Sequence, residues 1–196
     1  QWLKIYNRNP KFSTYVDKYL VRSHVSKTIG EEYLIPLIGV YNTVDQINWN
    51  ELPNQFAIKC NHGSGTNIIC KNKDSLDINE SKRKPKKWLK QNWYWFGREW
   101  PYKNVKPKII IEQLLTNENG DIPNDYKFWV FNGEVKFINV HFKKNNKTKI
   151  NIYNRDWELQ KFGMVFENDL SVIHERPKNL KKMITHAEKL SEKLPF

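Results

Sequence analysis

The chain has 196 residues, with 33 lysines and arginines against 21 aspartates and glutamates, giving a formal net charge of +12. Hydrophobic residues make up 39% of the chain and aromatic residues 14%. This share can form a buried core, so a disordered or collagen-like chain is excluded. The longest weakly polar run, residues 33–44, falls short of the roughly 20 residues that cross a bilayer, so we expect no transmembrane helix.

The two cysteines, Cys60 and Cys70, have neither a CxxC spacing nor histidines at zinc-ligand spacing. The sequence therefore predicts neither a disulfide framework nor a structural metal site. Reduced thiols favour a cytoplasmic location, and a peripheral position at the inner face of the membrane is compatible with it. The chain begins with Gln1 and without a signal-peptide pattern, so we expect it to be an internal piece of a longer translated chain.

The positive charge is concentrated in residues 82–108, which hold ten basic residues and one acid and so supply +9 of the total. Aromatic residues are interleaved with the basic ones: Trp88, Trp93, Trp95, Trp100 and Tyr102. Such a pattern can bind single-stranded nucleic acid, but lysines outnumber arginines 27 to 6, and bidentate recognition favours arginine. We expect a groove for an anionic substrate or for nucleotide phosphates and no nucleic-acid partner. A solvated lysine face over a tryptophan core is the alternative.

In the first half of the chain, Thr14 and Asp17 have capping-box spacing and Gly30 is a typical stop, which predicts a helix over residues 14–29. Residues 33–40 are apolar but contain Pro36, which indicates an edge strand or a connector. Four further elements are predicted along the same half: strands over residues 56–60 and 67–71, a helix over residues 85–96 and a strand over residues 108–115.

The second half carries the strongest hairpin pattern, because Asn132-Gly133 separates two alternating runs, residues 126–131 and 134–142. The alternation places Tyr126, Phe128 and Val130 on one face. A turn at residues 119–120 precedes the hairpin, and residues 150–153 and 162–166 are candidate strands. A last helix is predicted from Pro177, with its apolar positions at helical spacing: Leu180, Met183, Ile184, Ala187 and Leu190.

The first pattern with chemistry in it is the glycine-rich turn of residues 61–66, between the strands over residues 56–60 and 67–71. Successive backbone N–H groups in a Gly-Ser-Gly turn can converge on a phosphate, and Lys59 could supply a fixed positive charge. The spacing is that of neither a Walker A loop nor a Rossmann turn. A plain hairpin turn is the alternative interpretation.

The order of motifs resembles an ATP-grasp domain: Lys59 before Asn61-His62-Gly63-Ser64-Gly65, then Ile109 to Leu115, then Asp125-Tyr126-Lys127. With the run from Asp17 to Pro36, the segment from Arg98 to Tyr102 and the hairpin from Asp125 to Gly133, the chain is more closely similar to the teichuronopeptide-biosynthesis (TupA-like) ATP-grasp group of bacterial surface-polysaccharide loci. The resemblance covers about residue 10 to residue 196. It implies an α+β fold of antiparallel sheets with packed helices.

The resemblance also implies roles for individual residues. Two lysines of an ATP-grasp enzyme contact the nucleotide, one on an early helix and one before the glycine-rich loop, and Lys18 and Lys59 take those places. Gly63, Ser64 and Gly65 would form the flexible loop over the β- and γ-phosphates. Lys18 as a solvated helix lysine is the alternative. His62 would either donate to a phosphate or shape the turn.

The strand that ends in Glu112, Gln113 and Leu115 resembles the hinge between the two ATP-gripping halves. The resemblance implies that backbone groups of Gln113 and Leu115 read the adenine edge, and that Glu112 accepts from the adenine amino group or from a lysine. Asp125 would bind ribose hydroxyls and Lys127 would reach a phosphate. A turn aspartate and an exposed strand lysine are their alternatives.

The resemblance further implies ATP and Mg²⁺ as cofactors. Its magnesium ligands would follow the helix that begins at Pro177, and the sequence ends at Phe196. We therefore expect no metal ligands and no C-terminal metal-binding strands in this chain, and little or no turnover by it alone. The expected organisation is an N-terminal helical part over residues 1–50, a glycine-loop subdomain over residues 51–115 and an incomplete C-terminal subdomain over residues 116–196.

The function implied is a carboxylate–amine ligase of capsular or cell-wall polysaccharide synthesis that works through an acyl phosphate. The basic segment suits an acidic acceptor, a uronic acid glycan or an acidic peptide, and a small amine would be the second substrate. A sugar-modifying transferase of the same loci is one alternative. A non-catalytic basic module that binds anionic glycan or RNA is another. The catalytic residues, the oligomeric state and the roles of Arg98, Trp100 and Arg155 stay unassigned.

Overall fold

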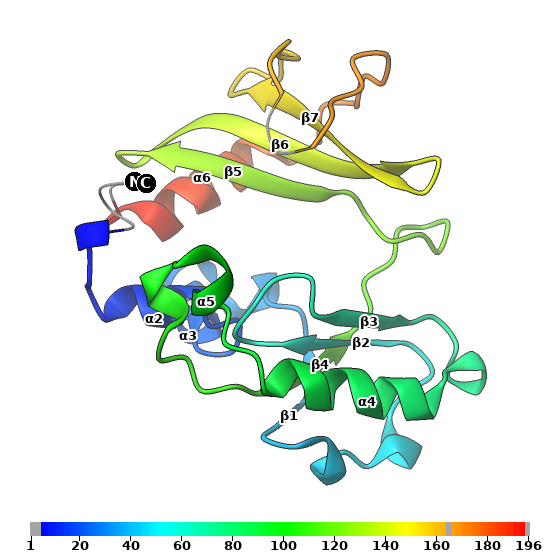
Figure 1. The fold of residues 1–196 in the computed structure, drawn as a ribbon. Coiled ribbons are helices and arrows are strands. Elements are labelled where there is room, and N and C mark those ends of the chain that lie inside the picture. Colours follow the sequence, from blue (N-terminus) through cyan, green and yellow to red (C-terminus); the bar gives the residue numbers. More distant parts are fainter. Residues whose placement is uncertain (1–4, 164–165, 195–196) are drawn as a thin grey trace. The chain divides into compact units, whose positions relative to one another are not determined.

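The computed structural model describes residues 5–163 and 166–194 and divides into two compact units, Gln1–Leu115 and Thr116–Phe196 (Figure 1). Each unit contains one antiparallel sheet with helices beside it, so the predicted α+β class is confirmed. In the described part of the chain, no helix has the length and apolar character that crossing a membrane requires.

The first unit is built on a four-stranded sheet in the order β1-β4-β2-β3. Its strands are β1 (Leu37–Tyr41), β2 (Phe56–Cys60), β3 (Asn67–Cys70) and β4 (Ile109–Gln113). All four predicted strands are present, and β1 is an edge strand as Pro36 indicated. The first strand begins later than predicted because residues 31–33 form a 3₁₀ turn.

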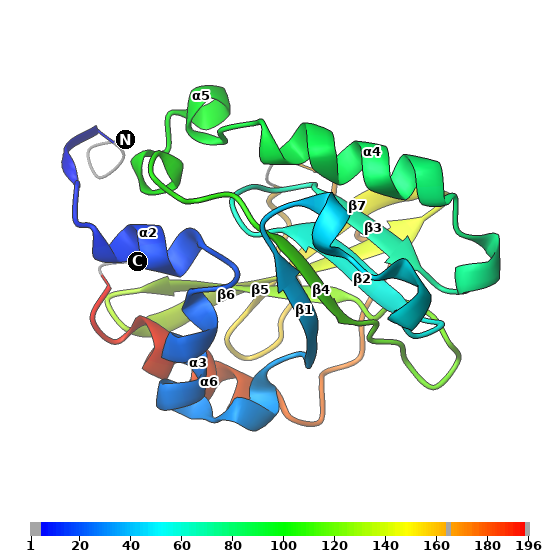
Figure 2. The ribbon, with the colours of Figure 1, turned by 90° about the horizontal axis from the view of Figure 1, so that it is seen from below.

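The first unit includes the helices α2 (Lys11–Val16), α3 (Val21–Ile29), α4 (Ile78–Leu89) and α5 (Tyr94–Gly97). Short 3₁₀ turns lie between these helices at Glu31–Tyr33, Val44–Gln46, Trp49–Glu51 and Lys73–Ser75, and another follows α5 at Trp100–Tyr102. Helix α4 runs along the sheet (Figure 2) and contacts β2.

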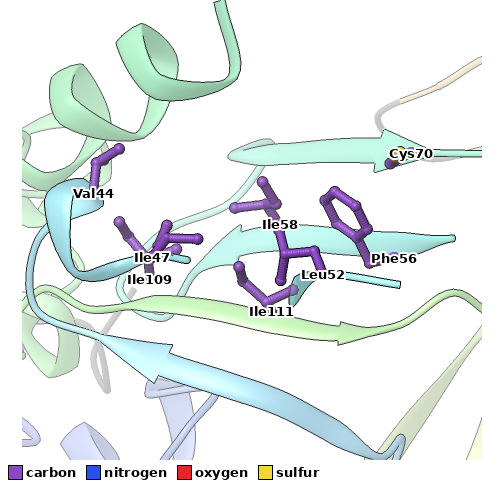
Figure 3. Close-up of a cluster of buried hydrophobic side chains, with 8 residues drawn as sticks. All are labelled: Val44, Ile47, Leu52, Phe56, Ile58, Cys70, Ile109 and Ile111. Atoms are coloured by element: carbon purple, nitrogen blue, oxygen red, sulfur yellow. The ribbon is translucent and has the colours of Figure 1, made fainter. Parts of the chain in front are cut away.

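One face of this sheet is closed by a hydrophobic cluster (Figure 3): Val44, Ile47, Leu52, Phe56, Ile58, Cys70, Ile109 and Ile111. Leu89 of α4 packs against the same cluster. Side chains alternate across a strand, so the neighbours of Ile58 and Ile111, which are Lys59 and Glu112, project from the opposite face. The face of the sheet opposite the hydrophobic cluster therefore carries the polar side chains of Lys59 and Glu112.

The predicted single helix over residues 14–29 is wrong, because α2 ends at Val16 and α3 begins at Val21. Asp17 has an extended backbone and accepts from the N–H groups of Tyr19 at 2.8 Å and Leu20 at 3.2 Å. An aspartate that satisfies nearby N–H groups in this way competes with the helix. Lys18 therefore lies on a turn between two helices and not on an early helix.

The predicted helix over residues 85–96 is also wrong. Helix α4 begins at Ile78 because the side chain of Asp77 accepts from the N–H of Glu80 at 2.9 Å as an N-cap. Pro85 lies inside this helix, buried like Ser81 one turn before it. Because proline is most typical of the first helical turn, the sequence wrongly indicated that the helix begins at residue 85.

The second unit has a three-stranded sheet in the order β5-β6-β7, with β5 (Asp125–Phe131), β6 (Glu134–Lys144) and β7 (Lys147–Asn154). The predicted hairpin is confirmed, and its turn residues Asn132 and Gly133 have φ values of 50° and 79°. The predicted strand over residues 150–153 lies within β7. Of the predicted strand over residues 162–166, residues 164 and 165 lie outside the described part, and the other three are not in a strand.

Helix α6 (Leu180–Ser191) packs on one face of this second sheet. It begins later than Pro177, and Leu180 and Ile184 form its buried stripe as predicted. Val135 and Ile138 of β6 complete the cluster. From β5, the side chains of Tyr126, Phe128 and Val130 pack against this cluster, so the prediction that they share one face is confirmed.

Candidate functional site

A lysine–glutamate pair lies on the face of the first sheet that the core leaves polar. Lys59 of β2 donates from its Nζ to Oε2 of Glu112 on β4, over 2.7 Å. Only 9% of the Glu112 side chain and 29% of the Lys59 side chain are exposed. Each of these charges would be strongly destabilising without the other, because both have little contact with water. The antiparallel pairing of β2 with β4 brings the two residues together.

Glu112 has a second cationic partner, Arg22 of α3. Nη1 of Arg22 lies 3.2 Å from Oε1 of Glu112, and Nη2 donates to the carbonyl of Ile35 over 2.7 Å. One carboxylate therefore pairs with two cations, one at each of its oxygens. Arg22 was not predicted from the sequence, because a lone arginine in an early helix carries no motif and its partner is 90 residues away.

Lys18 reaches the glycine-rich loop. Its Nζ donates to the carbonyl of Gly63, and its backbone N–H donates to the carbonyl of Asn61 over 3.2 Å. Burial lowers the pKa of Lys18, and the nearby charge of Lys59 lowers it further. Two lysines thus lie near the glycine-rich loop, and an anion between them would be attracted to both.

Asn61 joins the three segments that form the site. Its Nδ2 donates to Oδ2 of Asp17 over 2.9 Å and to the carbonyl of Lys106 over 3.0 Å. Its Oδ1 accepts from the N–H of Lys108 over 2.7 Å. Asn61 and Asp17 are both buried, with 0% and 3% of their surface exposed. The pair therefore fixes the turn of Lys18 against the end of β2.

The glycine-rich loop is anchored at its start and open at its tip. His62 is buried, and its Nε2 lies 3.1 Å from the carbonyls of both Trp88 and Gln91. Burial lowers the pKa of His62. These contacts give His62 a part in holding the loop. Ser64 and Gly65 are exposed, and the φ of Gly65 is +72°, a conformation that favours glycine.

Trp93 packs against the loop from the basic segment. A Cβ at Gly63 would come within 3.2 Å of Cε3 of Trp93. Gly63 therefore lets the indole ring lie close to the loop backbone. Together with His62, this contact ties residues 88–93 of the basic segment to the glycine-rich loop.

The two residues predicted to read adenine lie at the end of β4. The N–H of Gln113 donates to the carbonyl of Pro36 over 3.0 Å, so this group is engaged within the fold. Leu115 is 46% exposed. Both residues follow Glu112 in the sequence. In the described part of the chain, no hydrogen bond or ion pair joins either of them to Lys18 or Lys59.

Asp125 and Lys127 belong to the second unit. Both are exposed on β5, and their charged groups lie 3.1 Å apart. Cross-strand pairing puts Asp125 opposite His141 and Lys127 opposite Asn139, so the four side chains share the face away from α6. Burial and the charge of Lys127 lower the pKa of His141.

His141 is a second residue that sequence reasoning missed. Its Nε2 is buried without a hydrogen-bond partner, and such a group is uncommon. The only sequence signal was its place in the alternating strand opposite Asp125.

The three residues without an assigned role have separate surroundings. Arg155 pairs with Glu188 on α6 within the second unit. The guanidinium of Arg98 lies 4.7 Å from the ring centroid of Trp95, and Trp100 is half-buried with Arg8 over its ring.

Within residues 5–163 and 166–194, no group of three or more His, Cys, Asp or Glu side chains is arranged to hold a metal ion. Lys18, Lys59 and Arg22 lie near two carboxylates, those of Asp17 and Glu112, and we call these three cations the lysine cluster. Cations therefore outnumber anions at this site. The chemistry available there is the binding of an anion, with a glycine-rich loop beside it.

Comparison with known proteins gave a family match. The family model described as TupA-like ATPgrasp matches residues 1–196. Neither the curated proteins nor the solved structures gave a match. Because the family match spans the whole sequence and the loop, lysines and antiparallel sheets are all present, this chain belongs to the TupA-like ATP-grasp family.

Proposed function

We propose that this chain is the ATP-binding module of a carboxylate–amine ligase that serves capsular or cell-wall polysaccharide synthesis. The observation that carries the proposal is the meeting of Lys18 and Lys59 at the glycine-rich loop. Two partly buried lysines beside one loop attract a ligand with several negative charges, and a triphosphate has them. Membership of an ATP-grasp family supports the same ligand.

The nucleotide would replace contacts that the lysines now make. Lys59 would move from Glu112 to a phosphate oxygen, and Lys18 would move from the carbonyl of Gly63. Arg22 would stay on Glu112, so the buried carboxylate keeps a cation when Lys59 leaves. The loop N–H groups of Gly63, Ser64 and Gly65 would surround the β- and γ-phosphates, and Gln113 and Leu115 would border the adenine. Asp125 would bind ribose hydroxyls and Lys127 a phosphate.

In the proposed reaction, a carboxylate oxygen of the acceptor attacks the γ-phosphorus and the bond to the β–γ bridging oxygen breaks, releasing ADP. The amine nitrogen then attacks the acyl carbon, phosphate leaves and the nitrogen loses a proton, which gives an amide. The lysines neutralise charge on the phosphates, and the closed loop keeps water from the acyl phosphate. The family implies Mg²⁺, but the described residues offer no set of ligands for it.

Thermal unfolding with and without ATP and MgCl₂ tests the proposal. A specific ligand at a hundredfold excess over its Kd raises the free energy of unfolding by about 2.7 kcal/mol. We expect Lys59→Gln to lose most of this gain. Lys86→Gln is the matched control, because Lys86 is an exposed lysine paired only with the exposed Asp45. Equal responses of all three proteins, or no response by the unaltered chain, would contradict the proposal.

A further inference from the structure

A buried histidine lies at the start of the glycine-rich loop, and the partners of both its ring nitrogens are oxygen atoms that accept hydrogen bonds. Only 4% of the surface of His62 is exposed. Its Nε2 lies 3.1 Å from the carbonyl oxygens of both Trp88 and Gln91, and its Nδ1 lies 3.2 Å from Oδ1 of Asn61. A neutral imidazole carries one N–H, whereas an imidazolium carries two. The neutral ring can therefore donate on only one of its two sides.

The atom beside Nδ1 of His62 is identified as an oxygen by the other contacts of the same amide. Oδ1 of Asn61 accepts from the N–H of Lys108 over 2.7 Å. Nδ2 of Asn61 donates to Oδ2 of Asp17 and to the carbonyl of Lys106, over 2.9 and 3.0 Å. A flipped amide would place donor against donor and acceptor against acceptor, so its orientation is fixed. When neutral His62 donates from Nε2, the lone pair of Nδ1 therefore points at another lone pair.

Charges and dipoles around the ring act in both directions on its protonation. Burial lowers the pKa of His62, and the charge of Lys18 lowers it further. The carbonyls of Trp88 and Gln91, at the negative C-terminal end of α4, raise it, as does the charge of Asp17. Further charged side chains of the neighbouring segments are paired elsewhere or exposed: Lys59 with Glu112, Lys108 with Asn42, and Lys86, Lys87, Lys90 and Lys106.

We propose that His62 takes up a proton from solvent when a polyanion occupies the glycine-rich loop, and that the imidazolium then holds the loop to α4 by donating from both ring nitrogens. The negative ligand offsets the charge of Lys18, whose Nζ already donates to the carbonyl of Gly63, next to His62. The new N–H bond at Nδ1 replaces a contact between two lone pairs by a hydrogen bond to Asn61. His62 is thus a positioning residue that couples charge in the loop to the fixation of the loop.

This inference goes beyond the proposed function and rests on it for one point, that the loop binds phosphates. The acceptor oxygens around His62 do not depend on that point. Because coupling between two binding events is reciprocal, a ligand that raises the proton affinity of His62 must itself bind more tightly as the pH falls. Asn61 also bonds Asp17, so protonation acts on the turn that carries Lys18.

Long-range proton–nitrogen NMR of the imidazole ring tests the donor geometry without ligand, from about pH 8 down to about pH 4. Comparison with His62→Gln assigns the signal. We expect the neutral ring to carry its proton on Nε2 and to gain a second proton on Nδ1, while the amide signals of residues 61–63 stay dispersed. A neutral ring protonated on Nδ1 would overturn the proposal. Loop amide signals that move to random-coil positions when His62 is protonated would also overturn it.

The same spectra with inorganic tripolyphosphate test the coupling, and the pKa of His62 should rise when the loop is occupied. Calorimetry at about pH 8 and about pH 5.5 measures the affinity on either side of the usual histidine range. The gain in affinity at the lower pH should be about tenfold larger in the unaltered chain than in His62→Gln. The comparison cancels the protonation of the ligand and of Lys18. His24→Gln is the matched control, because His24 lies on α3 beside Thr28, and it should behave like the unaltered chain.

The outcomes separate this inference from the proposed function. If tripolyphosphate shifts the loop signals while the titration of His62 stays the same, the coupling is overturned and the phosphate site stands. Equal pH dependence in the unaltered chain and in His62→Gln has the same meaning. If tripolyphosphate does not bind, both proposals fail. Lys59→Gln should weaken binding at both pH values and keep the ratio between them, because it leaves the surroundings of His62 unchanged. Circular dichroism establishes that each variant is folded.

Discussion

Replacing Glu112 by glutamine tests whether the lysine cluster is held together by one buried carboxylate. The change keeps the shape of the side chain but removes the charge that lies 2.7 Å from Nζ of Lys59 and 3.2 Å from Nη1 of Arg22. The two cations are then left largely dehydrated, with 29% and 16% of their side chains exposed. Breaking a fully buried ion pair costs about 3–5 kcal/mol.

Because Lys59 keeps some contact with water, we expect a loss of about 2–3 kcal/mol in the free energy of unfolding for Glu112→Gln. For a domain of this size such a loss lowers Tm by roughly 10–15 °C. Urea unfolding followed by circular dichroism at pH 7 measures it. Glu51→Gln is the control, since Glu51 is an exposed glutamate of the same unit.

ATP should restore much of the stability that Glu112→Gln loses, because phosphates supply the missing negative charge. The rise in the free energy of unfolding on adding ATP should therefore be larger in the variant than in the unaltered chain. A loss below about 0.5 kcal/mol, the usual range for surface substitutions, would refute the idea of a dehydrated cluster. A variant that no longer responds to ATP would show that the carboxylate contacts the nucleotide and does not merely balance the lysines.

Three further predictions concern other parts of the chain. Asn61→Ala should lower the free energy of unfolding, measured by urea denaturation, by about 3 kcal/mol, because it removes hydrogen bonds to Asp17, Lys106 and Lys108. Replacement of the exposed Asn104 by alanine is the control and should change this free energy by no more than about 0.5 kcal/mol. Gly65→Ala should cost about 1 kcal/mol because the φ of +72° is strained for alanine, and Gly65→Asn should cost less; equal costs would contradict this. Hydrogen bonds from Lys144, then Ser171, lower the pKa of Asp169 from 3.8 to about 2. A carboxyl group whose pKa is lowered by folding stabilises the folded state above pH 3.8, and this stabilisation is lost as the pH falls to about 2. The Tm difference between the unaltered chain and Lys144→Gln should therefore disappear across that pH interval. A constant difference in Tm would contradict this.

The strands were predictable because each carries its own local signal. Alternation and the Asn132-Gly133 turn define the second sheet, and short apolar runs around the glycine-rich turn define β2 and β3. The helix limits failed where a single side chain decides them. Asp17 ends a helix by accepting two N–H groups, and Asp77 begins one well before Pro85. A periodic pattern does not show which aspartate will do this.

The candidate site was predictable only in part. Lys59 stood out as a charged residue in an apolar strand, and the glycine-rich turn marked its surroundings. Arg22 and Asn61 owe their places to partners distant in sequence, Glu112 in one case and Asp17 with Lys106 in the other. These contacts exist only after the sheet has formed. Local sequence patterns could not indicate them.

The most direct test of the central claim is to follow the backbone amide signals of Gly63, Ser64 and Gly65 by NMR during titration. We predict that ATP and inorganic tripolyphosphate shift these three signals and that adenosine alone leaves them in place, because the phosphates are what the loop and the two lysines bind. Lys59→Gln should weaken both titrations. Shifts with adenosine but not with tripolyphosphate, or no shift in the loop with ATP, would contradict the account.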